Sequence, residues 1–124
     1  MVCPDTNCVI AYLAGDPGAD VEFLDKLLER KMVALSPVVV AELLSDPALP
    51  TEAEMLIRSL PELHVAPGYW QRAGKLRAQL AQKGYKARLA DTLIAQSCLD
   101  HQVPLLTRDL GFRRFAKVVG LQLL

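Results

Sequence analysis

The sequence predicts an α/β fold in which helices cover both faces of a parallel sheet. Strand-like and helical segments alternate along all 124 residues, as they do when a crossover helix follows each parallel strand. The composition, with 52% apolar and 23% charged residues, is typical of one globular domain. No repeat, low-complexity stretch or long linker divides the chain. We therefore expect a single domain over residues 1–124, with a three-layer α/β/α architecture and four to five strands.

Apolar spacing and helix-start signals define the elements of the first half. Asp20 is placed to cap one helix, and Ser36 followed by Pro37 is a typical helix start. Thr51, with Glu54 three residues later, matches a capping box. The expected elements are a short strand ending at Asp5, helices over about 6–13, 20–31, 37–45 and 51–60, and strands over 32–35 and 63–66.

The second half continues the same alternation. Apolar residues recur at helical spacing from Tyr69 until Gly84, where a glycine ends the pattern. If the first and fourth strands are neighbours, the strand order becomes 3-2-1-4-5. The expected elements are helices over about 69–84, 89–101 and 110–115, and strands over 104–107 and 117–123.

The cysteines and the N-terminal residues indicate in which cellular compartment the protein resides. Cys3, Cys8 and Cys98 cannot all pair, and none has the spacing of a zinc or redox motif. Pro4 and Asp5 precede any apolar signal segment, and no stretch approaches about 18 uncharged apolar residues. We expect a reduced, cytoplasmic protein without a membrane segment.

The zero net charge conceals an asymmetry between the two halves of the chain. Residues 1–62 carry eleven acids and four bases, whereas residues 63–124 carry three acids and ten bases. A basic half can attract a polyanion such as a nucleic acid. Ordinary solvated helix faces explain scattered Lys and Arg equally well, so the charge alone does not decide the partner.

Four of the fourteen acids lie in unexpected places. Asp5 closes the first strand, and Asp109 follows the fourth. Glu42 and Asp91 interrupt helices that are otherwise apolar. Asp91 stands at the head of the apolar stripe of its helix. A charge in such a place has to be paired or liganded, because burial of an unpaired carboxylate is costly.

These four side chains can meet at one edge of the sheet. In open α/β sheets, ligands bind beyond the carboxyl ends of the strands, where the strand order reverses. Two like charges about 4 Å apart repel by roughly 4 kcal/mol at an effective dielectric of about 20. The cluster therefore calls for a hard cation, Mg²⁺ or Mn²⁺. Such an ion acidifies a bound water and binds a phosphate oxygen.

Simpler interpretations of the same acids stay open. Asp5 and Asp109 each precede a helix and can serve as N-caps. Asp91 can pair with Arg88 one turn earlier, and Glu42 with an arginine elsewhere. The joint occurrence of all four acids favours the metal site.

The acids lie within recurring motifs. In chain order these are Asp5-Thr6-Asn7, residues 36–43 around Glu42, residues 89–95 around Asp91, and Leu106-Thr107-Arg108-Asp109 followed by Phe112. In this order and spacing the chain resembles the PIN domain family, and within it the VapC-like toxin ribonucleases of type II toxin–antitoxin pairs. The resemblance covers essentially the whole chain. Gly111 stands where many members carry a further acid.

The resemblance implies a PIN-like fold, activity and partners. Members use Mg²⁺ or Mn²⁺ to cleave single-stranded or loop RNA, commonly form homodimers, and as toxins are inhibited by a cognate antitoxin. The acidic metal cluster and catalytic residues would be Asp5, Glu42, Asp91 and Asp109, with Asn7 and Thr107 as polar supports. The basic residues that flank the motifs, and that we expect at RNA phosphates, are Lys86, Arg88 and Arg108.

The predicted function is hydrolysis of an RNA phosphodiester bond by a metal-activated water. A phosphotransferase with an Asp-x-Asp motif is disfavoured, because Asn7 takes the place of the second carboxylate. The alternative that remains is a non-catalytic PIN-like module that binds RNA or a protein.

Overall fold

Five short segments lie side by side and in parallel at the centre of the molecule. The computed structural model describes residues 1–124. β1 (Cys3–Pro4) pairs with β2 (Leu105–Leu106) in a two-stranded sheet. Numbered in chain order, the five paired segments lie next to one another in the spatial order 3-2-1-4-5, in agreement with the prediction. The single bridges that extend the sheet join Val2 to Val33, Leu35 to Glu62, and Leu105 to Leu123.

The sheet has fewer regular strands than expected, because three of the five segments pair through isolated bridges and do not form continuous ladders. The segment expected as a strand over 63–66 pairs at Glu62 instead. The Leu63 N–H donates to the Leu35 carbonyl at 2.8 Å. The chain then approaches Pro67, which has no N–H to extend a ladder. The predicted number of strands is therefore not confirmed, although the fold class is.

The strand expected over 117–123 begins as a helix. α7 (Arg113–Val119) continues through its first residues, and Gly120 ends the helix in the left-handed region at φ 73°. Glycine at this position is a common helix end, because it adopts positive φ without steric cost. Only Leu123 then pairs with the sheet.

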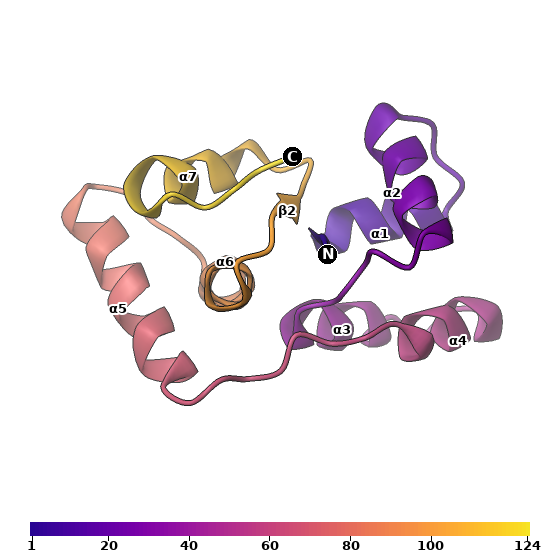
Figure 1. Ribbon diagram of the computed structural model, residues 1–124, viewed down its shortest axis with the longest axis horizontal. Helices are drawn as coiled ribbons and strands as arrows, with labels where there is room; N and C mark the ends of the chain where they lie inside the picture. The colour runs from indigo at the N-terminus through magenta and orange to yellow at the C-terminus, as the bar shows by residue number, and fades with distance from the viewer.

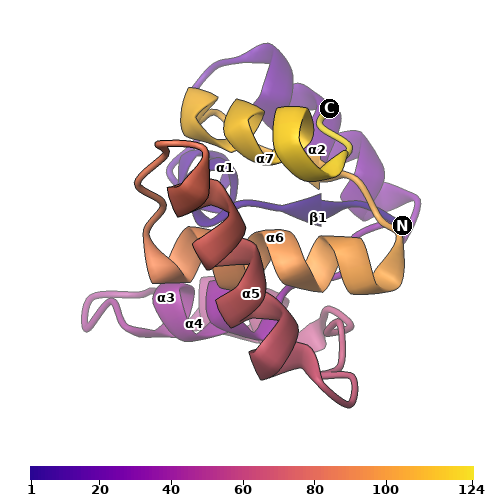
Figure 2. The ribbon, with the colours of Figure 1, turned by 90° about the vertical axis from the view of Figure 1, so that its left-hand side faces the viewer.

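Helices form layers on both sides of the sheet. Besides α7, the helices are α1 (Thr6–Leu13), α2 (Ala19–Glu29), α3 (Pro37–Leu44), α4 (Thr51–Ser59), α5 (Tyr69–Gln82), α6 (Leu89–His101) and the 3₁₀ helix η1 (Leu110–Phe112). Figure 2 shows β1 between α6 on one side and α7 on the other. α6 packs against α3 and α5, whereas α1 packs against α2 (Figure 1).

Two helix starts differ from the sequence prediction. α2 begins after Gly18, so Asp20 lies in the first turn rather than at the cap. Its carboxylate pairs with Arg108 instead. The capping box expected at the start of α4 does not form, because Pro50 is the N-cap and Glu54 turns toward Arg58. In both helices an acid predicted to cap the backbone forms an ion pair instead. The partner of Glu54 lies one turn later on the same helix, and the partner of Asp20 lies on a distant segment.

A continuous apolar core of 23 buried residues fills the space between the layers. Leu35 and Leu105 from the sheet are 0% exposed, and Ile94 from α6 is 1% exposed. Membrane crossing is not a property of any helix here, since none is both long and apolar enough. Core burial of this kind supplies most of the stability of a domain.

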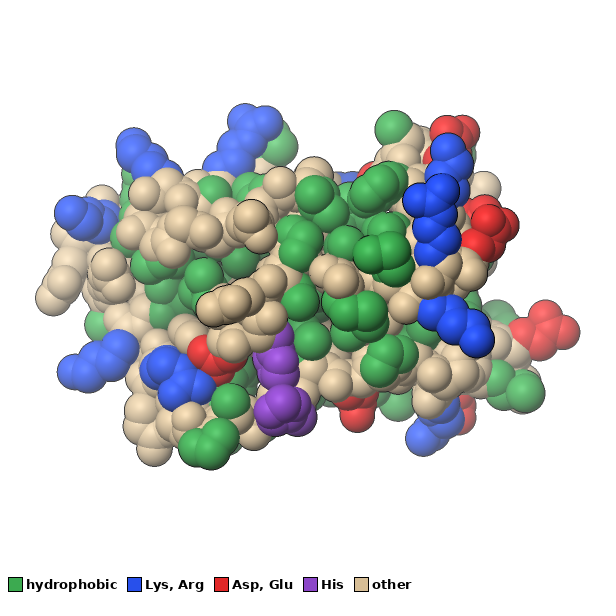
Figure 3. Space-filling view, viewed as in Figure 1, with side chains coloured by type: hydrophobic (Ala, Val, Ile, Leu, Met, Phe, Trp, Pro, Cys, Tyr) green, Lys and Arg blue, Asp and Glu red, His purple; other side chains and the backbone are tan.

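The charge asymmetry of the sequence is visible on the surface. In Figure 3, Lys and Arg side chains lie over α5 and α7 with few acids among them, whereas both signs occur over α2 and α4. The fold therefore keeps the two halves of the chain, and their opposite charges, on different parts of the molecule.

A polar network ties α5 to α6. Arg72 makes a two-pronged contact with Asp100, from Nε to Oδ1 at 3.0 Å and from Nη2 to Oδ2 at 2.6 Å. Gln96 donates a further hydrogen bond to Oδ1 at 2.8 Å. These hydrogen bonds, above all those from Arg72, lower the pKa of Asp100.

We expect Asp100→Asn to destabilise the protein by about 1 kcal/mol at neutral pH. Because the folded pKa of Asp100 is lowered, its contribution is present above the unfolded value of about 3.9 and is lost as pH falls through the folded value. Thermal unfolding at pH 7 and at about pH 2.5 measures the difference. The exposed control Glu62→Gln is expected to match the wild type. Equal Tm values for wild type and Asp100→Asn at pH 7 would contradict the prediction.

Candidate active site

Asp5 lies at the junction of β1 and α1. Its backbone is extended (φ −71°, ψ 157°), so the helix starts at Thr6 and the carboxylate acts as N-cap. Oδ1 accepts from the Thr6 N–H at 2.8 Å, and Oδ2 accepts from Thr107 Oγ1 at 2.9 Å. Asp5 is only 5% exposed. The chain therefore holds this carboxylate in one orientation from two segments that are far apart in the sequence.

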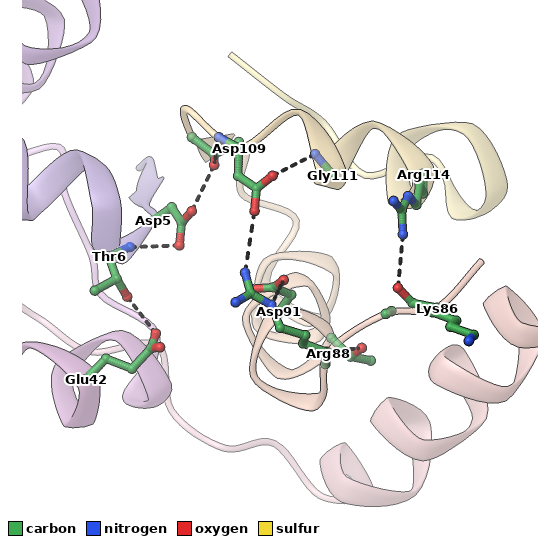
Figure 4. Close-up of polar contacts among 12 residues, drawn as sticks. Asp5, Thr6, Glu42, Lys86, Arg88, Asp91, Asp109, Gly111 and Arg114 are labelled. Atoms are coloured by element: carbon green, nitrogen blue, oxygen red, sulfur yellow. Dashed lines mark hydrogen bonds and ion pairs between the residues drawn. The ribbon is translucent and has the colours of Figure 1, made fainter.

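Asp91 and Asp109 face each other from α6 and η1. Asp91 lies in the first turn of α6, and its side chain is 23% exposed. Asp109 is the N-cap of η1, where Oδ1 accepts from the Gly111 N–H at 2.8 Å. Arg88 lies between them, with Nε 3.2 Å from Asp91 Oδ2 and Nη2 3.7 Å from Asp109 Oδ2 (Figure 4). The pairing of Asp91 with Arg88 that the sequence allowed is thus present.

Glu42 lies on the exposed face of α3, not in a buried position as its apolar neighbours suggest. Its Oε1 accepts a hydrogen bond from Thr6 Oγ1 at 2.7 Å. No arginine or lysine pairs with it. Thr6 therefore connects Glu42 to Asp5, since its backbone contacts one acid and its hydroxyl the other (Figure 4).

The four acids influence one another electrostatically. Burial raises the pKa of Asp5, and the charges of Asp91 and Glu42 add to this, against the hydrogen bonds from Thr107 and Thr6. Burial also raises the pKa of Asp91. Arg88 opposes that shift, while the charges of Asp109 and Glu42 reinforce it. Negative charge is thus concentrated at one edge of the sheet, at the carboxyl ends of β1 and β2.

The acids do not form a closed coordination shell in this conformation. No three Asp, Glu, His or Cys side chains are gathered closely enough to hold a metal ion. The donor set nevertheless suits a hard divalent cation, because the nearby ligand atoms are carboxylate oxygens. Asp91 and Asp109 would need to be released from Arg88 before their Oδ2 atoms could bind one.

The two predicted polar supports are placed differently. Thr107 donates to Asp5 and accepts from the Asp109 N–H at 3.0 Å, so it joins two of the acids. Asn7 is exposed on α1, and no hydrogen bond links its side chain to the acids. Sequence reasoning missed Thr6. The signal for it was local, since a hydroxyl next to an N-cap acid at a sheet edge can reach a neighbouring helix.

The three predicted phosphate contacts also differ in their surroundings. Lys86 and Arg88 line a hollow of about 210 Å³ together with Asp91 and Asp109. Arg108 points away toward α2, where it pairs with Asp20.

Arg114 completes the basic side of this hollow and was not predicted. Its Nη1 donates to the Lys86 carbonyl at 2.9 Å, and its guanidinium lies 5.8 Å from the centre of the Tyr85 ring. These contacts hold the segment before α6 against α7 (Figure 4). Asp91 and Asp109, with Arg88 between them, therefore border the hollow on one side, and Lys86 and Arg114 border it on the other (Figure 4).

Solved structures share this fold over nearly the whole chain. A chain in the crystal structure of VapBC2 from Rickettsia felis bound to a promoter DNA fragment has a TM-score of 0.78 at 23% identity, covering 100% of this chain and 98% of that chain. DNA-bound VapBC from Salmonella typhimurium gives 0.75 at 22%, covering 99% and 96%. A toxin-antitoxin complex from Klebsiella pneumoniae gives 0.69 at 22%, covering 98% and 95%. At these identities the similarity establishes a common fold.

Sequence comparison gives the family. No curated protein matches the chain at a significant level. The family model of the PIN domain, by contrast, matches residues 2–118, which is nearly the full length of the chain. The chain belongs to the PIN domain family.

Proposed function

We propose that this protein is an Mg²⁺- or Mn²⁺-dependent endoribonuclease that hydrolyses RNA phosphodiester bonds with an activated water. The observation that carries the proposal is the set of carboxylates from separate segments at one sheet edge, where burial and mutual repulsion raise the pKa values of Asp5 and Asp91. Membership of the PIN domain family supports nuclease chemistry in general.

We assign cation binding to Asp5, Glu42, Asp91 and Asp109. A bound divalent cation supplies positive charge beside the scissile phosphate and acidifies water. The chain itself orients the ligands. Thr107 fixes Asp5 and the backbone before η1, and Thr6 aligns Glu42 with Asp5. We keep Asn7, which is exposed next to Thr6, as a polar support of the acidic cluster.

RNA would approach across the basic side of the hollow. We assign Lys86 and Arg88 to backbone phosphates, because both line the hollow beside Asp91. Arg108 can take the same role only after it leaves Asp20. Unpaired RNA suits such a site, since its phosphates can enter a small hollow that a duplex cannot.

We further propose that the chain is a toxin with a cognate antitoxin, and that it acts in the cytoplasm as a homodimer. Structures of the same fold that are described as VapBC or toxin-antitoxin complexes, two of them with DNA, support the antitoxin partner alone. The homodimer is what the resemblance to the family implies, and the cytoplasmic location follows from the sequence interpretation.

A non-catalytic binding module is the second candidate. The observation that favours it is Arg88, whose guanidinium already pairs with two of the acids. Cleavage assays separate the two candidates, because a binding module retains RNA but leaves it intact.

We expect Asp5→Asn to lower RNA cleavage by more than about 100-fold, since a metal-binding oxygen is replaced by an amide. The fold is expected to persist because asparagine is as good an N-cap as aspartate. Sequencing of RNA ends after incubation with Mn²⁺ measures the effect. Asp16→Asn, which changes an exposed carboxylate without a side-chain hydrogen bond, is the control. Intact RNA with concentrated wild-type protein and Mn²⁺ would favour the binding module.

We expect Asp91→Asn to leave the metal-free Tm unchanged or raise it by up to about 3 °C. Burial and two neighbouring acids disfavour the charge of Asp91, and its partner Arg88 is 78% exposed, so the ion pair contributes little. Calorimetry in a chelator measures Tm. A fall of more than about 3 °C would instead identify Asp91 as part of a structural ion pair.

A further inference from the structure

Arg88 contacts the two acids through the oxygens that the backbone leaves open. Asp109 directs Oδ1 to the Gly111 N–H and Oδ2 to Arg88. On Asp91, Oδ2 faces Arg88 and no backbone N–H bonds either oxygen. The guanidinium therefore lies where a cation shared by these two carboxylates would have to lie (Figure 4).

The surroundings of Arg88 allow it to leave this position. It is the N-cap residue of α6 and its side chain is 78% exposed, so no packing holds the guanidinium in place. Solvent-exposed ion pairs are worth little, because water screens them and the long side chain loses rotamer freedom. A divalent cation, with twice the charge and no chain entropy to lose, competes well for the same oxygens.

Once released from the two acids, Arg88 can contact a phosphate in the same hollow. It lines the same hollow as the basic residues Lys86 and Arg114, which lie across from Asp91 and Asp109 (Figure 4). Arginine matches a phosphate with two parallel N–H donors, which is a stronger contact than it makes with the two separate carboxylates here.

We propose that Arg88 occupies the cation position in the metal-free protein, is displaced when a divalent cation binds, and then holds a phosphate of the substrate. Arg88 is in this sense a positioning residue that exchanges an acidic partner for a phosphate. The inference rests on the proposed function, because it assumes that Asp91 and Asp109 are cation ligands.

The first test measures Mn²⁺ affinity from free Mn²⁺ in electron paramagnetic resonance titrations. Arg88→Gln is expected to bind Mn²⁺ about fivefold more tightly than wild type, the equivalent of one exposed ion pair. The matched control is Arg114→Gln, which removes the same charge from the same hollow but contacts the Lys86 carbonyl rather than an acid. Its affinity is expected to stay within about twofold of wild type.

The outcomes separate this inference from the proposed function. Asp91→Asn is expected to weaken Mn²⁺ binding in both the wild-type and the Arg88→Gln backgrounds. Equal affinities for wild type and Arg88→Gln, with Asp91→Asn still deleterious, would overturn the inference and leave the metal site standing. Absence of Mn²⁺ binding in wild type and Arg88→Gln alike would overturn both. An equal gain in both arginine variants would reduce the effect to net charge and overturn the specific role of Arg88.

The second test uses adenosine 5′-monophosphate, which carries a phosphate monoester but no phosphodiester bond. At saturating Mn²⁺, Arg88→Gln is expected to bind it about fivefold more weakly than wild type. Arg88→Gln is thus expected to gain affinity for Mn²⁺ and to lose affinity for the nucleotide. A misfolded variant would lose affinity for both. Unchanged nucleotide affinity would overturn the exchange of partners.

Discussion

The parallel pairing of β1 with β2 is the constraint on which the rest of the site depends. The register sets Cys3 beside Leu105 and Pro4 beside Leu106, and the Asp5 N–H donates to the Leu106 carbonyl at 2.7 Å. This contact brings Asp5 to Thr107, although 102 positions separate them. A shift of one residue would send each side chain to the opposite face of the sheet and separate them. With only two residues in each strand, the helix layers have to maintain that register.

Burial differs systematically among the four acids. Asp5 is 5% exposed and bonded by two segments, the side chains of Asp91 and Asp109 are 23% and 31% exposed, and Glu42 lies on an open helix face. A buried charge is tolerated when hydrogen bonds or an ion compensate it, and an exposed charge when water does. Asp5 therefore forms the fixed end of the site, and the other acids form its adaptable side.

Local signals in the sequence predicted the elements with regular patterns, and tertiary contacts decided the others. α6 has the predicted bounds because apolar residues recur from Leu89 to Leu99 and Gln102 ends the helix in the left-handed region. The predicted strand order depended on the first and fourth strands being neighbours, and the pairing of β1 with β2 meets that condition. The start of the last strand was wrong because Val118 and Val119 suit a helix end as well as a strand, and the helix continues until Gly120 ends it. The positions of Glu42 and of the Arg88 guanidinium depend on rotamers and on packing between helices, which spacing does not encode.

The capping and metal-binding interpretations of the acids are compatible, since a carboxylate has two oxygens and about four lone-pair directions. On Asp109, Oδ1 accepts from the Gly111 N–H, and Oδ2 faces the hollow. On Glu42, Oε1 accepts from the Thr6 hydroxyl, and no hydrogen bond engages Oε2. Asp109 and Glu42 are thus each oriented by one hydrogen bond while the other oxygen remains for a ligand. Asp5 accepts one hydrogen bond on each oxygen and keeps a second lone-pair direction on both. An N-cap aspartate at a sheet edge is for this reason evidence of preorganisation, and finding that it caps a helix does not argue against a catalytic role.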